Sequence, residues 1–422
     1  AEKIVLYDTQ VKYDKSYRYL IFAYVMVIGS EYQYKNLDLQ GVEDDLWQTS
    51  CDVETMPNLK EISSINDTLE DLVLISGLSG HETKVRDYLK KQLNENALNA
   101  KTDVLGNLIC TLKGNEKLPS VILFAHMDQL GFMVKKIEDN GYIRVERVGG
   151  VPEKALLSQD VVIVNNKQEL IQGVIGNKAH HATQPNEKYT VHKVNEIYID
   201  AGFKSKREVL RNGVNIGSPI TYAPYYKSLK NNNVCGSSID DRAGCAVILN
   251  AAKALTKSKN RPTVHIVFSV QEEFNLRGIL PVINTLKPNI AIQVDLTLTS
   301  DTPDMVNSSD VYLGKGPCVS LFSFHGRGTL NGVIPHPSII EIFEKVAKTK
   351  KITLQRSVAS GILTDASYVQ FSNEGIASID VGFPMRYSHS SREVCNLNDL
   401  IDLKNLLVAV INKIDKKIKL IR

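Results

Sequence analysis

Four short segments of this chain each join an apolar run to residues that can bind a metal ion. They are VILFAHMD at 121–128, SSIDDRAG at 237–244, VHIVFSVQEE at 264–273 and AIQVDLT at 291–297. Ligands of an open α/β sheet bind beyond the carboxyl ends of its strands, so such residues can meet at one edge. RYSHSSRE at 386–393 adds a histidine. The inventory suits two adjacent divalent metals and one general base: His126, Asp240, Glu272, Glu273, Asp295 and His389.

The bulk composition narrows the class of protein. A chain of 422 residues is too long for one ordinary core and predicts two or more domains. The hydrophobic share of 43% and the charged share of 23% are typical of a soluble globular protein. The net charge is only +3 and there is no long basic run. We therefore expect no nucleic-acid partner and no membrane partner.

The six cysteines show neither a CxxC pair nor regular spacing. Free thiols in a reducing cytoplasm explain them better than a disulfide framework or a cysteine zinc site. Cys245 follows Gly244 in an expected helix, where a buried small hydrophobe is the better interpretation than a nucleophile.

Residues 1–57 differ from the rest of the chain, with seven tyrosines and the only tryptophan. The apolar run at 17–29 is too short to span a bilayer. Basic residues precede it, as in a signal peptide, but no small-residue cleavage site follows cleanly. Its β-branched and aromatic content favours a strand. We expect an N-terminal extension of unknown role on a cytoplasmic protein.

The pattern becomes regular from about residue 64. Ser79 and Glu82 have the S-x-x-E spacing of a capping box, which predicts a helix through VRDYLKKQL. Residues 119–125 read as a buried strand. Valine and isoleucine alternate with polar residues across 129–233, which predicts a small β-rich module. Beyond residue 240, helices are expected at 241–255, 338–348, 365–371 and 397–415, and strands at 263–270, 289–296 and 376–382.

This alternation predicts an α/β fold, a mixed sheet with helices on both faces. The expected domains are the extension 1–57, a catalytic domain made of 58–128 and 234–422, and the β-rich insertion 129–233.

Each candidate residue also has a plainer explanation. His126 ends a strand, where a histidine is more often structural, although Asp128 could accept its second ring N–H and fix the tautomer. Asp240 or Asp241 could simply begin a helix, but an Asp-Asp pair is costly unless a cation is near. A carboxylate there could bridge two ions about 3.5–4 Å apart.

The remaining candidates follow the same logic. Glu272 and Glu273 could lie in a solvated loop, or one could bind a metal while the other acts on a bound water. Asp295 lies inside an apolar strand, where a metal or a buried ion pair must compensate its charge. His389 lies in a polar loop, and its assignment depends on the other five. Histidine and carboxylate ligands without cysteine suit Zn²⁺, Co²⁺ or Mn²⁺.

These residues resemble the M42 family of metallo-aminopeptidases, the group that includes glutamyl aminopeptidase and the TET aminopeptidases. The resemblance covers about residues 64–417. The matching segments occur in the family's order: SGHETKVRDYL, DVLGNL, HMDQLGFMV, SIDDRAGCAV, SVQEEFNLRG, VDLTLTSDTPD, GKGP, LTDASYVQ and RYSHSSRE.

The resemblance implies a role for each candidate. His126, Asp240 and Asp295 would hold one metal. Asp240, Glu273 and His389 would hold the other, with Asp240 bridging. Glu272 would be the general base for a metal-bridging water, and Asp128 would orient His126. The insertion at 129–233 would be a dimerisation domain. The chain would form dimers, which would assemble further into a dodecamer. The substrates would be short peptides.

The sequence departs from the family pattern at several points. Gln129 replaces the Glu of HxDEIG, Asn275 replaces the Gly of EEVGLRG, and Ala179-His180-His181 replaces PPH. His325 and His336 lie where the family often has a histidine. Asn275 would need a positive φ, which asparagine tolerates. The sequence leaves the preferred N-terminal residue and the native metal open.

Two alternatives remain at this point. An M20-like amidohydrolase that deacylates amino acids would use similar metal ligands. The sequences of the DDR and EEFNLRG segments favour the M42 family. A catalytically silent scaffold of the same fold would be expected to lack a ligand or the base, and none is missing here.

Overall fold

The computed structural model describes residues 59–326 and 331–422. Every helix and strand described below lies in the unit Met56–Arg422. The strand predicted at 17–29 lies outside the described residues. Within the described ranges, no helix has the length and apolar character needed to cross a membrane.

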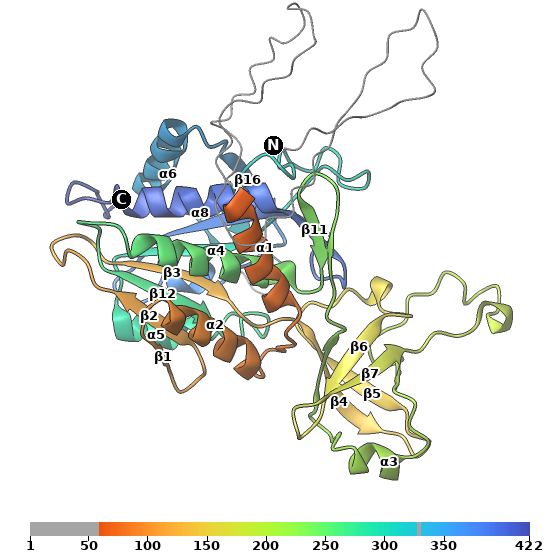
Figure 1. Cartoon of the computed structure of the whole chain (residues 1–422). Helices are drawn as coiled ribbons and strands as arrows, with labels where there is room; N and C mark the ends of the chain where they lie inside the picture. Colours follow the sequence, from red (N-terminus) through yellow and green to blue (C-terminus); the bar gives the residue numbers. More distant parts are fainter. Residues whose placement is uncertain (1–58, 327–330) are drawn as a thin grey trace, which may run out of the picture. The chain divides into compact units, whose positions relative to one another are not determined.

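A 12-stranded mixed sheet forms the larger part of this unit (Figure 1). Its main path runs β1-β2-β12-β3-β13-β17-β18-β11-β10, and β14, β15 and β16 branch from β17. The strands β12, β3, β13 and β17 are parallel neighbours at its centre. The bounds are β1 Ala100–Thr102, β2 Leu108–Leu112, β3 Val121–His126, β10 Tyr226–Ser228, β11 Asn233–Gly236, β12 Val264–Ser269, β13 Ile290–Leu298, β14 Cys318–Phe324, β15 Gly332–Val333, β16 Gln355–Ser360, β17 Ala377–Arg386 and β18 Glu393–Asn396.

Helices cover both faces of the sheet, as the sequence predicts. One face packs against α1, α2, α4, α6 and α8, which share the main hydrophobic core. The other packs against α5 and α7 through a smaller cluster. The bounds are α1 Leu59–Val73, α2 Thr83–Glu95, α4 Ile239–Leu255, α5 Ile279–Leu286, α6 Pro337–Lys350, α7 Ala366–Val369 and α8 Leu397–Ile411.

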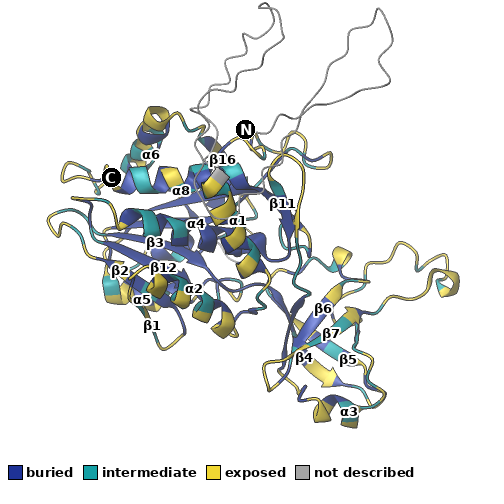
Figure 2. Cartoon of the chain, viewed as in Figure 1, coloured by how far each residue is buried: buried dark blue, intermediate teal, exposed yellow. Residues whose placement is uncertain are grey.

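The central strands are largely apolar because both faces are covered. Every residue of β3 and β12 is buried (Figure 2). This is why an unbroken apolar run, rather than an alternating one, marks these strands in the sequence.

The inserted segment forms a separate closed barrel with strand order β4-β5-β8-β7-β6-β9 (Figure 1). Its apolar core is distinct from the cores of the large sheet. The bounds are β4 Gly131–Ile137, β5 Ile143–Val148, η1 Glu153–Ala155, β6 Asp160–Val164, β7 Leu170–Ile175, η2 His180–Ala182, β8 Ile199–Asp200, α3 Lys206–Arg211 and β9 Pro219–Tyr222.

The predicted capping box is wrong. The helix α2 forms, but Glu82 itself is the residue before its first turn and makes no side-chain cap. The Ser79 hydroxyl donates to Asp128 instead of to the helix. The S-x-x-E spacing is present, but Ser79 binds Asp128 and Glu82 accepts the backbone N–H of Gln271.

Candidate functional site

The candidate residues lie at the carboxyl edge of the central parallel strands. His126 is the last residue of β3 and pairs in register with Ser269, the last residue of β12. Asp295 lies near the end of β13, which runs parallel to β17. Because parallel strands end at the same edge, segments far apart in sequence meet there.

The side chains form two groups, within each of which one ligand atom per residue lies within 4.8 Å of the others. The first group is His126, Asp241 and Asp295, all buried. The second is Asp240, Glu273 and His389. Asp241 is a residue that the sequence interpretation did not assign to a metal.

Asp240 contacts both groups. Its Oδ1 lies 3.2 Å from Nε2 of His126, and its Oδ2 lies 3.4 Å from Nε2 of His389. One carboxylate therefore spans the two groups with its two oxygens. Glu272 is adjacent, with its Oε2 at 3.8 Å from Nε2 of His126.

Burial and neighbouring charges shift the pKa values of the carboxylates in this site. Burial raises the pKa of Glu272 well above its usual range. Burial and the charge of Asp240 raise the pKa of Glu273 to about 7 and that of Asp295 to about 6. For Asp240, burial opposes ionisation, but hydrogen bonds from His126 and His389 hold its pKa below its usual range.

The histidines respond in the opposite sense. Burial alone would lower the pKa of His389, but Glu273 and Asp240 outweigh it and raise that pKa to about 11. Burial of His126 is likewise outweighed by the charges of Glu272, Asp128 and Asp240, which raise its pKa. The site thus holds protons where it would otherwise hold excess negative charge.

The donor set fits divalent cations. Among the described residues, the ion pairs of Asp240, Glu272 and Glu273 all involve one of the two histidines. Asp241 is buried and its Oδ2 has no hydrogen-bond partner. A buried carboxylate oxygen without a partner is costly unless a cation compensates it.

Asp128 is placed differently from the prediction. The nearer contact of His126 Nδ1 is the carbonyl oxygen of Asp128 at 3.1 Å, while Oδ1 of its carboxylate is 3.6 Å away. That carboxylate accepts the backbone N–H of Glu272 at 3.0 Å and of Glu273 at 3.1 Å. Asp128 therefore touches both the histidine and the turn that carries the two glutamates.

Glu393 is a residue that the sequence interpretation missed. It is 2% exposed, and its two oxygens accept the backbone N–H of His389 at 2.7 Å and of Asp240 at 3.0 Å. It ties together two members of the second group that are far apart in sequence. The only signal for it was a glutamate at the end of RYSHSSRE.

A cavity of about 960 Å³ opens over both groups. The sheet side contributes His325, Phe274 and Met305, and the strand β5 of the barrel contributes Arg147. His336, the other histidine noted in the sequence, begins α6 and does not line this cavity. Asn275 has a φ of 73°, so the expectation of a positive φ there is confirmed.

Comparisons with known proteins show which family this chain resembles. The family model of the M42 glutamyl aminopeptidases matches residues 106–406. SgcX of Escherichia coli strain K12 is 38% identical over 349 residues, covering 82% of this chain and 93% of SgcX.

Solved structures are also similar. An aminopeptidase from the archaeon Desulfurococcus kamchatkensis has a TM-score of 0.79 at 32% identity, covering 85% of this chain and 98% of that one. The Pyrococcus horikoshii TET1 peptidase, which assembles into a tetrahedron or a large octahedral shell, has a TM-score of 0.74 at 28% identity, covering 82% and 99%.

Proposed function

Because the chain belongs to the M42 glutamyl aminopeptidase family and is an aminopeptidase, we propose that it removes N-terminal residues from short peptides with two divalent metals and Glu272 as general base. The observation that carries the proposal is the Asp240 carboxylate, whose two oxygens contact His126 and His389. Two adjacent ions need a bridging ligand of this kind.

The proposed ligands divide as the resemblance implies. His126, Asp240 and Asp295 would hold one ion, and Asp240, Glu273 and His389 the other, with Zn²⁺, Co²⁺ or Mn²⁺ as candidates. Asp241 belongs to the first group of clustered side chains and would compete with Asp240 for that ion. When bound, the ions would lower the pKa of a water and polarise the scissile carbonyl.

Glu272 is proposed to move the proton. Its carboxylate lies beside His126 on the edge of the cleft, and burial raises its pKa. A raised pKa brings an acid closer to the working pH, where a general base is most effective. Glu272 would take a proton from the attacking water and deliver it to the leaving amine.

Asp128 is proposed to hold two parts of this machinery at once. Its carbonyl and carboxylate oxygens face Nδ1 of His126, which favours the tautomer that leaves Nε2 free for an ion. Its carboxylate also fixes the backbone of the Glu272 turn.

Substrate assays test the proposal directly. The protein loaded with Zn²⁺ or Co²⁺ is given a panel of aminoacyl-p-nitroanilides and, in parallel, N-acyl amino acids. We expect hydrolysis of the aminoacyl panel and two ions per chain by metal analysis. Activity confined to N-acyl amino acids would favour an M20-like deacylase, and fewer than two ions per chain would contradict the metal assignment.

The assembly is proposed from the barrel. The barrel, within the predicted insertion 129–233, would pair two copies of the chain, and pairs would assemble further into a dodecamer. In support, TET1 forms closed shells, and the connection from β7 to β8 exposes Tyr189 at 94% and Val191 at 50%. Light scattering tests this, since a monomer at micromolar concentration would contradict it.

We also propose a cytoplasmic location. The five cysteines in the described ranges are free thiols and all are buried. Unpaired thiols of this kind suit a reducing compartment.

A further inference from the structure

The turn that carries the proposed base has an unusual backbone. Gln271, Asn275 and Leu276 have φ values of 56°, 73° and 56°. Asparagine tolerates this left-handed region, but for Gln271 and Leu276 it costs roughly 1–2 kcal/mol each. Such a turn does not keep its shape through local preference, so surrounding contacts must hold it.

One set of contacts reaches the turn through Asp128. The Ser79 hydroxyl donates to Oδ2 of Asp128. The same carboxylate accepts the N–H groups of Glu272 and Glu273. Ser79 is 4% exposed and Asp128 is fully buried, so water does not replace this hydrogen bond readily.

A second set of contacts comes from Glu82. Its Oε1 accepts the backbone N–H of Gly80 at 2.6 Å and of Gln271 at 3.3 Å. Glu82 is 4% exposed, and burial raises its pKa to about 7. One oxygen therefore joins the segment before α2 to the residue next to Glu272.

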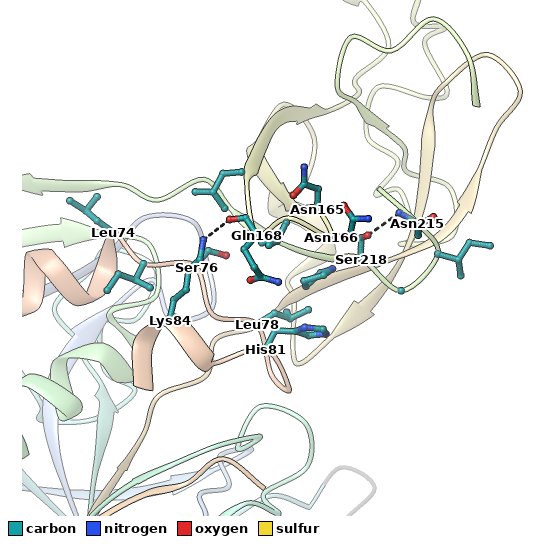
Figure 3. A pocket seen from close by; sticks show the side chains of 16 residues that line it. Leu74, Ser76, Leu78, His81, Lys84, Asn165, Asn166, Gln168, Asn215 and Ser218 are labelled. Atoms are coloured by element: carbon teal, nitrogen blue, oxygen red, sulfur yellow. Dashed lines mark hydrogen bonds between the residues drawn. The ribbon is translucent and has the colours of Figure 1, made fainter. Parts of the chain in front are cut away.

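The other side of the same segment faces the barrel. A cavity of about 430 Å³ at the junction is lined by Leu78, His81 and Lys84 (Figure 3). The Lys84 ammonium donates to the carbonyl oxygen of Gln168 in the barrel at 2.6 Å. Residues 78–84 therefore lie between the barrel and the glutamate turn.

We propose that Ser79 and Glu82 are positioning residues for the general base. They hold the backbone of residues 271–273 so that the Glu272 carboxylate stays directed at the two ligand groups. Neither touches substrate. The inference rests on the proposed role of Glu272 and adds to it the reason why the S-x-x-E spacing exists without a helix cap.

The variants Glu82→Ala and Ser79→Ala test this in the metal-loaded protein. Glu82→Ala removes a direct contact to the turn, and Ser79→Ala removes the hydroxyl that holds Asp128 against it. In each variant kcat should fall roughly ten- to hundredfold, as for other groups that orient catalytic residues. KM and bound metal should stay unchanged. Glu82→Gln keeps an amide oxygen that can accept both N–H groups, so it should recover most of the lost kcat.

Asp399→Ala is the matched control. Asp399 is also a buried carboxylate that accepts two backbone N–H groups, from Gly314 and Gly316, each at 2.7 Å. Neither Asp399 nor these glycines lines the cleft. Its variant should lower the melting temperature and leave kcat per folded molecule unchanged.

Several results separate the outcomes. Normal kcat in both Glu82→Ala and Ser79→Ala would overturn the positioning role. A fall in kcat that is explained by loss of bound metal would also overturn it. So would a Glu82→Gln variant with a kcat as low as that of Glu82→Ala. If Glu82→Ala does not fold, Ser79→Ala alone decides, because it deletes a single hydroxyl. If Glu272→Gln keeps a near-normal rate, the base assignment itself fails; if only Glu272→Gln is inactive, the base stands and the positioning role fails.

Discussion

The two cores of this chain treat charge in opposite ways. In residues 131–222, all of which the structure describes, no Asp, Glu, His, Lys or Arg side chain is buried. The large sheet and its helices bury many, among them Asp128, Asp240, Asp295 and Glu393. The barrel is held by apolar packing, whereas the sheet edge concentrates acids that need a cation, a proton or a backbone N–H.

This contrast predicts that changes in the barrel affect stability, whereas changes at the sheet edge affect activity. Apolar burial responds to packing and hardly to pH or metal. Buried acids respond to both. A change in one region should therefore leave the other region unaffected.

The largest effect is expected for Glu272→Gln. Removing the proposed base should lower kcat by about 10²–10⁴-fold, while metal analysis should still find two ions per chain. Glu146→Gln on the barrel surface, where Glu146 pairs with Lys135, should leave kcat unchanged. A near-normal rate in Glu272→Gln would mean that another group moves the proton.

Next in size is Phe132→Ala in the barrel. Phe132 is fully buried and packs edge-on against Tyr222 with ring centroids 6.4 Å apart. The cavity should cost about 3–5 kcal/mol of unfolding free energy. Urea titration should show this loss with bound metal and kcat per folded molecule unchanged. Loss of metal from this variant would show that the two cores are coupled.

Metal removal should act on the sheet edge alone. An ion present at a hundredfold excess over its Kd stabilises the folded state by about 2.7 kcal/mol. On chelation, hydrogen exchange should speed up in the peptides that contain Asp240 and His389, and stay unchanged in β4 and β6. Equal acceleration in the barrel would contradict the contrast.

The smallest effect is a pH dependence in the metal-free protein. Burial raises the pKa of Asp399 to about 7, so between pH 4 and 7 the folded state keeps a proton that the unfolded state has released. Stability from this group is complete below the unfolded pKa and is lost as pH rises through the folded pKa.

Asp399→Asn checks this sign. The free energy of unfolding, measured with urea, should fall less between pH 4.5 and 6.5 in this variant than in the unmodified protein. The difference should be roughly 2 kcal/mol. Asp160→Asn, at the exposed first residue of the barrel strand β6, is the control and should leave the pH profile unchanged. A decline of the same steepness in Asp399→Asn would assign the pH dependence to other acids.

Much of the fold could be predicted because buried parallel strands leave a plain signal. The runs that form β3, β12 and β13 are largely apolar, and each contains or leads to a charged or polar residue. The insertion stood out because its alternation marks strands with one face in a core. The helix α1, Leu59–Val73, begins before residue 64, where the sequence pattern becomes regular, because polar residues dominate its first turns.

The site was harder to predict where side chains act on distant backbone. Glu393, Glu82 and Ser79 bind N–H groups of residues brought close only by the fold. No local pattern marks such a partner. In the case of Ser79 and Glu82, a familiar spacing pointed to a helix cap instead. Local sequence does not separate Asp240 from Asp241, and the resemblance implied a metal role for Asp240 alone.

The wide separation of the ligands along the chain has a consequence for biosynthesis. His126 ends β3 in the first third of the sequence, while His389 follows β17 near the last helix. Since a chain is made from its N-terminus onward, a nascent chain that has reached β13 still lacks the strand that leads to His389. On the proposed ligand assignment, the peptidase would stay inert on the ribosome until nearly all of it has emerged, and N-terminal fragments left by interrupted synthesis should have no peptidase activity.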